Sequence, residues 1–501
     1  MTAQAAGSQR SSTASGLALV GAVVTTIANF AMAWLVSTEG AAAAGVFFVA
    51  TAVTTILANT SSLGSMTGVV YAMPTAEGAG GARRVVAIAL PPVLAAAAAA
   101  TIGVLALAGP VADAVTDSDG AADDLAVMLR VMAVAIAPFA LNLLFAAVTR
   151  ALGSQTPTVA TTQVLRPGGQ IVLLGAVFVW RDDPSPALVA AAWAAPVVVA
   201  AAACIGWAAS FGTFTRRPID DPAALDASTF WAYTRPRAVS TALQIALERI
   251  DVVLVSAFVG GGAAGVYGAL SRFVTAGSFL IYSVAQAVSP RLRQAIAAER
   301  WPDAHRLLQQ ATTWLVLVVW PYFLLLAVRP APLARILSPD YVDDAAILGV
   351  LAIGMLVSAA AGPIELTLLM LGRSDRALWG IAAAIVTDLA LLMLLAPRFG
   401  LWGAAIAWAA SIVVQNALAT WFVDVETRPG GPARASQPLR APSRAAGLAA
   451  LGAVIATVPI GLLVPDTLVG VILAGVVAVV VLGGWVWRFR DAFGVAALLQ
   501  R

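Results

Sequence analysis

The chain has 501 residues, of which 60% are hydrophobic and only 11% are charged, and its mean hydropathy is +0.89. A soluble domain carries about a quarter charged residues, so this composition excludes a soluble globular protein. The formal net charge of +3 is small and lies next to the predicted membrane spans, which does not indicate a nucleic-acid partner.

Missing residue types argue against several kinds of chemistry. The chain contains no lysine, so it cannot build a Walker phosphate-binding loop. His305 is the only histidine and Cys204 the only cysteine, which argues against a histidine-based metal site, a Ser-His-Asp triad and an intrachain disulfide. We therefore expect no metal, no cofactor and no enzymatic activity.

Long apolar stretches recur along the whole chain, and about 20 apolar residues are enough to cross a bilayer as a helix. The pattern predicts an all-α polytopic membrane protein with fourteen transmembrane helices. The predicted spans are 14–36, 43–64, 84–109, 126–148, 158–180, 186–212, 238–260, 264–288, 307–328, 345–370, 377–397, 400–422, 445–464 and 467–487.

An internal repeat divides the first twelve spans into two halves. Ala43-Ala44-Gly45-Val46-Phe47 follows the first span, and Ala263-Ala264-Gly265-Val266-Tyr267 follows the seventh, 220 residues later. Two six-helix lobes related by a pseudo-two-fold axis are typical of transporters, with the substrate path between them. The predicted domains are a flexible cytoplasmic tail (1–13), an N-lobe of helices 1–6 (14–212), a cytoplasmic linker (213–237), a C-lobe of helices 7–12 (238–423), a second cytoplasmic linker (424–444), and helices 13–14 with a short cytoplasmic tail (445–501).

The arginines predict the orientation in the cytoplasmic membrane. Most lie at the termini or in one alternate set of connections, which the positive-inside rule places in the cytoplasm together with both termini. These are Arg10, Arg83, Arg84, Arg150, Arg216, Arg217, Arg235, Arg237, Arg291, Arg293, Arg300, Arg306, Arg373, Arg376 and those from Arg428 onward. The opposite connections hold Arg181, Arg329, Arg335 and Arg398, together with an acidic run from Asp113 to Asp124.

Charged residues within spans are candidates for function, because each costs roughly 3 kcal/mol to insert at mid-membrane. In the seventh span, Thr241, Gln244, Glu248 and Asp251 share one helix face that must look into a cavity or another helix. Arg249 points away from Asp251 and needs a different partner.

Asp251 and Arg272 in the eighth span lie at nearly equal depth, so they can pair across a helical hairpin. This pair is either a structural lock or one that opens for an anionic head group or a coupling ion. Asp388, halfway along the eleventh span, is a candidate for ion coupling or for neutralising an arginine.

The fifth span carries Thr162, Arg166 and Gln170 at a spacing of four residues, interrupted by Pro167-Gly168-Gly169. Proline removes a backbone donor and the glycines loosen the helix, so the sequence predicts a kink or break beside Arg166. A guanidinium binds phosphate bidentately, which favours an anionic substrate; the alternative is a pair with a carboxylate elsewhere.

Several motifs resemble those of the polysaccharide transporter family, within the multidrug/oligosaccharidyl-lipid/polysaccharide exporter superfamily. They are Ile250-Asp251 followed by Gly265-Val266-Tyr267 and Ser271-Arg272-Phe273, then Ser289-Pro290-Arg291-Leu292, and finally Pro397-Arg398-Phe399-Gly400-Leu401-Trp402-Gly403-Ala404-Ala405-Ile406-Ala407. The last matches the family's turn between helices 11 and 12, with Phe399 for the usual tyrosine. Asp388 and Arg249 depart from the family's pattern, and both leave the coupling ion open.

The resemblance implies a flippase that moves undecaprenyl-diphosphate-linked oligosaccharides to the outer leaflet by alternating access, for surface polysaccharide biosynthesis. It implies that Arg166 and Arg272 face a central cavity and hold the diphosphate; we add Arg249 as a further candidate. Asp251 and Glu248 would poise or release these arginines, and the expected partners are membrane lipids and the glycosyltransferases and polymerase of the pathway. The alternatives are a lipid II flippase, a cation-coupled multidrug exporter and a non-transporting scaffold of a glycan-synthesis complex.

Overall fold

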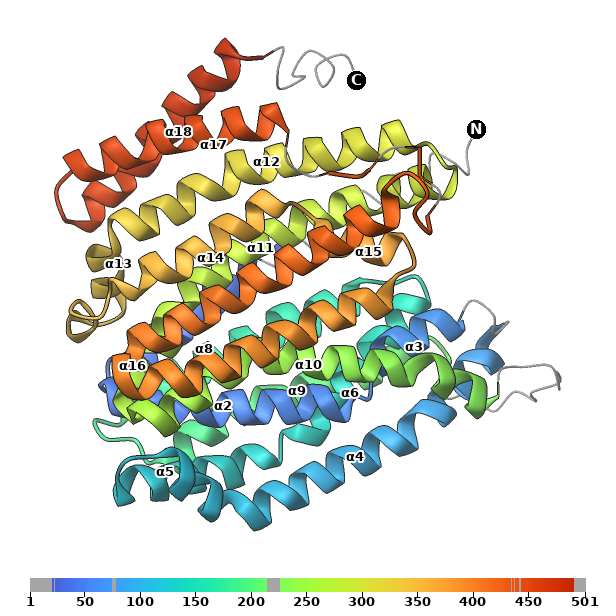
Figure 1. Cartoon of the computed structure of the whole chain (residues 1–501). Coiled ribbons are helices and arrows are strands. Elements are labelled where there is room, and N and C mark those ends of the chain that lie inside the picture. Colours follow the sequence, from blue (N-terminus) through green and yellow to red (C-terminus); the bar gives the residue numbers. More distant parts are fainter. Residues whose placement is uncertain are drawn as a thin grey trace. The chain divides into compact units, whose positions relative to one another are not determined.

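The computed structural model describes residues 20–73 except Ala22, 78–213, 226–433, 435–436, 438–440 and 443–490. Their backbone forms helices and the turns that connect them, with no strand among these residues. Contacts divide the chain into two compact units, Met1–Gly268 and Ala269–Arg501 (Figure 1). The predicted tail 1–13 and most of the predicted linker 213–237 lie outside the described residues.

The first unit contains the helices that correspond to predicted spans 1 to 7. They are Val23–Ser37, α2 (Ala41–Ser61), α3 (Ser65–Ala72), α4 (Gly78–Val115), α5 (Asp119–Ala133), α6 (Ile136–Ala151), α7 (Thr156–Thr158), the π-helical segment η2 (Val159–Leu165), α8 (Arg166–Trp180), α9 (Pro186–Ser210) and α10 (Ala227–Val259). The first residues of α11 (Gly261–Ala297) also belong to this unit.

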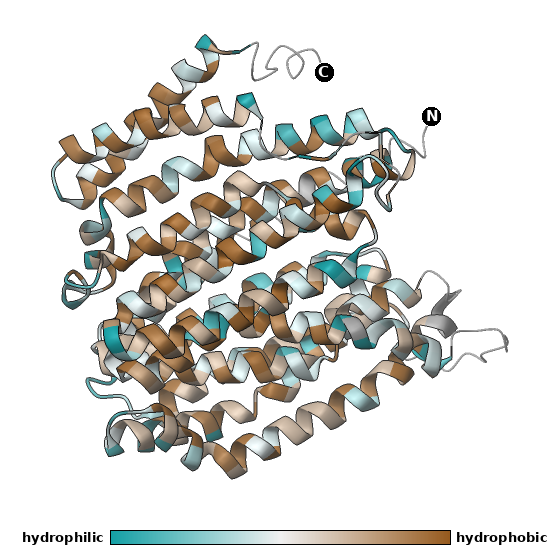
Figure 2. Cartoon of the chain, in the orientation of Figure 1, coloured by the Kyte–Doolittle hydropathy of each residue, from teal (hydrophilic) through white to brown (hydrophobic). Residues whose placement is uncertain are grey.

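The second unit begins within α11 and contains the helices of predicted spans 9 to 14. They are α12 (Trp301–Val328), α13 (Pro330–Leu337), the short 3-10 helix η3 (Pro339–Tyr341), α14 (Ile347–Ala361), α15 (Ile364–Met370), α16 (Ser374–Thr427), α17 (Arg444–Leu463) and α18 (Leu468–Arg488). Figure 2 shows hydrophobic residues along most of these helices, whereas hydrophilic residues gather toward helix ends and loops.

Within the described residues, each predicted span overlaps one or more helices, and the eleventh and twelfth spans both lie in α16. Nine described helices are long and apolar enough to cross a membrane, and the number rises to 11 if each bent pair is one span. The α5–α6 and α14–α15 pairs each bend by 43°. The protein is therefore an all-helical, multi-pass membrane protein, and the count of fourteen agrees with this helix order but stays a prediction.

The turn predicted at residues 397–407 lies inside α16, which consists of two helices that meet at a sharp kink at Gly400. Gly400 has a φ of 55° and a ψ of −134°, which breaks the helix there. A positive φ is accessible to glycine because it lacks a Cβ. A Cβ on Gly403 would also collide with the carbonyl of Leu395. Both glycines of this motif are therefore required by the tight reversal between the predicted eleventh and twelfth spans.

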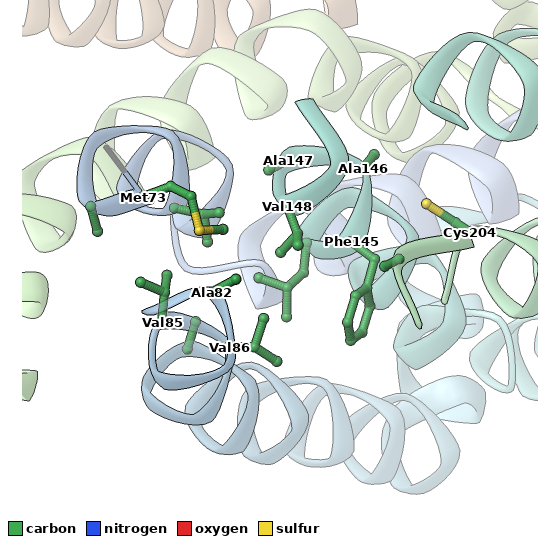
Figure 3. Close-up of a cluster of buried hydrophobic side chains, with 14 of the residues drawn as sticks. Met73, Ala82, Val85, Val86, Phe145, Ala146, Ala147, Val148 and Cys204 are labelled. Carbon is green, nitrogen blue, oxygen red and sulfur yellow. The ribbon is translucent and has the colours of Figure 1, made fainter. Parts of the chain in front are cut away.

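Each unit has a hydrophobic cluster where several helix ends meet. In the first unit, the ends of α3, α4, α6 and α9 bring together side chains such as Met73, Val85, Phe145 and Cys204 (Figure 3). In the second unit, a cluster that includes Leu292, Leu308 and Val423 joins α11, α12, α15 and α16. Such clusters hold the helix ends together within each unit.

The contact boundary at Gly268 differs from the predicted lobe boundary. α10 was assigned to the C-lobe, but it packs against α2, α3 and α4 in the first unit. Contacts between α10 and its neighbours do not bear on whether the sequence repeats after six helices. The division into two six-helix lobes therefore stays a prediction.

Candidate functional site

Arg166 stands at the junction of two kinds of helix. The π-helical segment η2 ends at Leu165, and α8 begins at Arg166, whose backbone N–H donates to the carbonyl of Thr161, five residues earlier. Leu165 and Arg166 both keep helical dihedral angles. The predicted break is therefore a local widening of a continuous helix, and π-helical turns of this kind are frequent at functional sites.

Pro167 contributes to this irregular geometry because it has no N–H to donate to the carbonyl of Gln163, four residues earlier. The hydroxyl of Thr25, on the helix Val23–Ser37, donates to that carbonyl at 3.1 Å. The two helices also approach closely nearby, where a Cβ on Gly21 would collide with the Gln163 side chain. The predicted first span thus stabilises the backbone just before Arg166.

The guanidinium of Arg166 stacks on an aromatic ring and lies near a second positive charge. Its Cζ is 4.5 Å from the centre of the Phe139 ring, on α6. Arg249, on α10, is close enough to repel Arg166 electrostatically. Among the described residues, neither arginine makes a salt bridge with a carboxylate. Two neighbouring cations without a paired carboxylate form a site that favours an anion.

The polar residues predicted to share one face of α10 differ in their exposure. Glu248 is exposed, and one of its carboxylate oxygens accepts a hydrogen bond of 3.2 Å from the Gln244 side chain. Thr241 is half-buried, whereas Asp251 is buried. A carboxylate at mid-span that protein atoms leave exposed needs water or a ligand around it. The exposed part of this face is therefore compatible with the predicted cavity.

Two residues that we predicted to line the cavity hydrogen bond to neighbouring helices. Thr162 donates to the side-chain oxygen of Asn142 on α6 at 2.9 Å, and Asn142 in turn donates to the carbonyl of Ala200 on α9 at 3.1 Å. Gln170 is buried and donates to the carbonyl of Trp193, also on α9, at 3.0 Å. These bonds give Thr162 and Gln170 a role in helix packing, and their contact with substrate stays a prediction.

The remaining predicted site residues belong to the second unit. Arg272, on α11, is 8% exposed, and Asp388, on α16, is fully buried. Both are therefore enclosed by protein rather than lipid, as expected for charged groups within a membrane span. The pair of Asp251 with Arg272 and the coupling role of Asp388 stay predictions.

Sequence reasoning missed Phe139 and Asn142. Phe139 is one of many aromatic residues in apolar spans, and only the fold brings it under Arg166. Asn142 carried a usable signal, because an amide in the middle of an otherwise apolar span must find hydrogen-bond partners. It finds them in Thr161, Thr162 and Ala200.

Residues 236–394 match the MatE family. No curated protein matches the chain in sequence. Among solved structures, the lipid II flippase MurJ in its inward closed conformation is similar with a TM-score of 0.75 and 12% identity, over 95% of this chain and 99% of that chain. An inward-facing multidrug resistance MATE family transporter of the MOP superfamily is similar with a TM-score of 0.62 and 18% identity, over 79% of this chain and 93% of that chain.

A MOP superfamily transporter from Pyrococcus furiosus is similar with a TM-score of 0.60 and 16% identity, over 81% of this chain and 92% of that chain. At these identities the likeness concerns the fold. It agrees with the superfamily that the sequence motifs resemble. The chain is therefore a multi-pass membrane protein with the fold of the MurJ and MATE transporters of the MOP superfamily, and it carries a MatE match across residues 236–394.

Proposed function

We propose that the protein is a flippase that moves an undecaprenyl-diphosphate-linked oligosaccharide from the cytoplasmic to the outer leaflet by alternating access. Arg166 and Arg249 bind the diphosphate, and Arg272 is a separate candidate on α11 for contact with the substrate. The protein acts in the cytoplasmic membrane, with both termini in the cytoplasm. It supplies surface polysaccharide biosynthesis and works beside the glycosyltransferases and polymerase of that pathway.

The observation that supports this proposal is the pair of neighbouring guanidiniums without a carboxylate partner at Arg166 and Arg249. A cation-coupled multidrug exporter needs a site that attracts positive charge, and this pair repels it. A diphosphate carries two linked anionic groups, and a site with two arginine charges favours such a ligand. Glu248 and Asp251, on the same helix as Arg249, are candidates to form salt bridges with the arginines after the substrate leaves.

Lipid II flipping is the second candidate, because it also presents a diphosphate on a polyprenyl chain. The similarity to the lipid II flippase MurJ across 95% of this chain favours it. The two candidates differ in the glycan and not in the charged group, so the arginine pair does not separate them. A direct comparison of the two substrates does.

The test is leaflet reorientation in proteoliposomes of a fluorescent undecaprenyl-diphosphate oligosaccharide, of lipid II, and of a polyprenyl monophosphate. The proteins are the wild type, Arg166→Ala, Arg249→Ala, Arg272→Ala and, as the matched control, Arg335→Ala. Arg335 is exposed on α13, outside the predicted spans. Because a hydrogen bond to a charged group is worth about 1.5–3 kcal/mol, each site variant should weaken diphosphate binding roughly 10- to 100-fold.

Loss of flipping in the folded site variants, with normal flipping by Arg335→Ala, would support the proposal. Faster flipping of lipid II than of the oligosaccharide would favour the second candidate. If flipping survives all three site substitutions, the arginines have a structural role and do not bind the diphosphate. Absence of flipping of any substrate by the wild type would favour the scaffold of a glycan-synthesis complex.

A further inference from the structure

Three side chains at the predicted cytoplasmic ends of α3 and α10 form a layered stack. The rings of Tyr71 on α3 and Tyr233 on α10 are 3.6 Å apart between their centroids and 12° from parallel. The Cζ of Arg237, also on α10, lies 3.9 Å from the centre of the Tyr233 ring. Both neighbours are too close to that ring to share one of its faces, so they cover opposite faces. The order of the layers is therefore Arg237, Tyr233 and Tyr71.

The packing of α3 on α10 holds the two rings almost directly over each other (Figure 1). A Cβ on Gly64 would lie 2.7 Å from the backbone of α10, and a Cβ on Gly68 would collide with the Thr234 hydroxyl. Neutral rings prefer an offset or edge-on contact, but a positive charge on the outer face of Tyr233 compensates for the stacked geometry. The helix crossing and the Arg237 guanidinium therefore fix the stack together.

The two outer layers of the stack are accessible. Tyr71 is 50% exposed although Tyr233 covers one of its faces, so the exposed area belongs to its other face and its edge. Arg237 is half-buried, and no carboxylate pairs with it in the part of the chain that the structure describes. The stack thus offers an open aromatic face at one end and guanidinium N–H donors at the other.

In the predicted topology, the stack lies at the depth of the head groups of the cytoplasmic leaflet. Arg237 immediately precedes the seventh span, and Tyr71 follows the end of the second span by seven residues. Arg237 is therefore at the level of the lipid phosphates, where a guanidinium attracts an anionic head group. Tyr71 is farther from the membrane, on the side to which the sugars of a lipid-linked glycan extend beyond the diphosphate.

The stack also extends the polar stripe of α10 toward the cytoplasm. Gln244 follows Tyr233 by eleven residues, which is about three helical turns. Glu248 follows Arg237 by the same number, so these four side chains lie on one side of the helix. The stack is therefore the cytoplasmic end of the stripe that carries the exposed Glu248 at mid-span.

We propose that the Arg237–Tyr233–Tyr71 stack is a cytoplasmic recognition site for the sugar–diphosphate end of the lipid-linked glycan. This inference rests on the proposed function and adds a second site, which binds the substrate before it reaches Arg166 and Arg249. Arg237 binds the diphosphate, as a guanidinium does through paired N–H donors. A sugar near the diphosphate packs its C–H groups on the open face of Tyr71, because the ring face is negative and C–H groups are weakly positive.

The test is a binding titration in detergent with two probes, citronellyl diphosphate that carries a disaccharide of N-acetylglucosamine and citronellyl diphosphate alone. The protein is the full chain with Arg166→Ala and Arg249→Ala, so that the mid-span arginines do not contribute. The sugar-bearing probe should bind roughly 2- to 10-fold more tightly than the bare probe, which is the effect of one aromatic contact. Tyr71→Ala should remove this difference and leave the affinity for the bare probe unchanged. Arg237→Ala should weaken the binding of both probes.

Control variants separate a sugar contact from a general effect of aromatic residues near the membrane surface. Tyr71→Phe keeps the ring and should keep the preference for the sugar-bearing probe. Trp379→Ala is the matched control, because Trp379 is 70% exposed near the predicted cytoplasmic start of the eleventh span. If Tyr71→Ala does not fold, Tyr71→Leu takes its place, because leucine fills much of the same space without a ring.

The outcomes separate this inference from the proposed function. Equal affinities for the two probes in the Arg166→Ala/Arg249→Ala protein would overturn the recognition site, as would an equal loss of both probes in Tyr71→Ala. Loss of the sugar preference in Trp379→Ala as well would show an effect of the membrane surface and no sugar contact. The diphosphate role of Arg166 and Arg249 fails separately, if the bare probe binds the wild type and the Arg166→Ala/Arg249→Ala protein equally. The comparison of the two probes still decides the role of Tyr71 in that case.

Discussion

At the scale of single residues, the aromatic ring beneath Arg166 holds the guanidinium that we assign to the diphosphate. The Phe139 ring lies 4.5 Å from the Arg166 Cζ. A cation–π contact contributes about 0.5–2 kcal/mol, so Phe139→Leu should weaken binding of a diphosphate lipid by roughly 2- to 30-fold. Phe139→Tyr keeps the ring and should bind like the wild type. Equal affinities for the Leu and Tyr variants in a binding titration would show that the ring does not position Arg166.

Asn142 is the residue on which the packing of the fifth span depends. Its amide bonds to Thr161 and Thr162 on η2 and to the carbonyl of Ala200 on α9. Hydrogen bonds between membrane helices average about 0.6 kcal/mol, so Asn142→Ala should lower the free energy of unfolding by about 2 kcal/mol.

The matched control for Asn142→Ala is Asn416→Ala. The Asn416 amide bonds to the carbonyl of Ile412 in its own helix, at 2.9 Å. Thermal unfolding in detergent should show a clear loss of stability for the Asn142 variant and little loss for the control. Equal losses would mean that the bonds between helices add nothing to the stability of this region.

Sequence alone indicated some of these residues and not others, for a physical reason. A charged residue in a span, such as Arg166 or Asp251, stands out because lipid cannot solvate it, whatever surrounds it. The importance of Phe139 depends on which helix packs against which, and an apolar span does not encode that choice. The Arg166–Arg249 neighbourhood also required the fold, because the two residues are far apart in the chain.

At the scale of elements, the fifth span shows how far local sequence reasoning reaches. Pro167 and the two glycines after it predicted irregularity beside Arg166, and the irregular segment is there, as η2. Its form is a π-helix before the proline rather than a break at it. The Gln163 carbonyl in this segment lies 3.1 Å from the hydroxyl of Thr25 on another helix, which also lies 2.9 Å from the Gly21 carbonyl, and such a partner cannot be read from the local sequence.

The C-terminal hairpin of α17 and α18 is fastened at one end by Arg329, which follows α12. Its guanidinium donates to the carbonyls of Gly461, Leu462 and Val464 and pairs with Asp466 at 3.4 Å. The Arg329 guanidinium therefore caps the end of α17, because the last carbonyls of a helix have no partner within the helix.

Arg329→Ala should therefore loosen the turn between α17 and α18. Even one lost charge-assisted bond costs about 1.5–3 kcal/mol, which corresponds to amide exchange roughly 10- to 100-fold faster at residues 461–466. Arg335→Ala removes an exposed arginine nearby in the sequence and serves as the control. Hydrogen exchange followed by mass spectrometry measures both, and unchanged protection of the turn in Arg329→Ala would contradict a capping role.

At the scale of the whole molecule, each unit gathers in one hydrophobic cluster several helix ends for which we predict the same side of the membrane. The first unit's cluster gathers the ends of α3, α6 and α9 with the start of α4, and the second unit's cluster gathers the ends of α11, α15 and α16 with the start of α12. Each set was predicted to face the cytoplasm. The sequence predicts these sides because apolar stretches mark the spans and arginines mark their cytoplasmic ends. The contact boundary at Gly268 depends on which helices α10 packs against, and hydropathy does not predict those contacts.

The sidedness of those helix ends can be measured directly. Ser118, before α5, and Ser436, between α16 and α17, are both exposed, and our orientation places Ser118 outside and Ser436 in the cytoplasm. In a Cys204→Ser background, a membrane-impermeant maleimide should label Ser118→Cys in intact cells and Ser436→Cys only after the membrane is opened. In the predicted topology, the fourth to the twelfth spans lie between Ser118 and Ser436. Because this is an odd number of spans, the two serines lie on opposite sides of the membrane. Labelling of both from one side would therefore require the loss or gain of a span between α5 and α16, and with it a different path for the substrate.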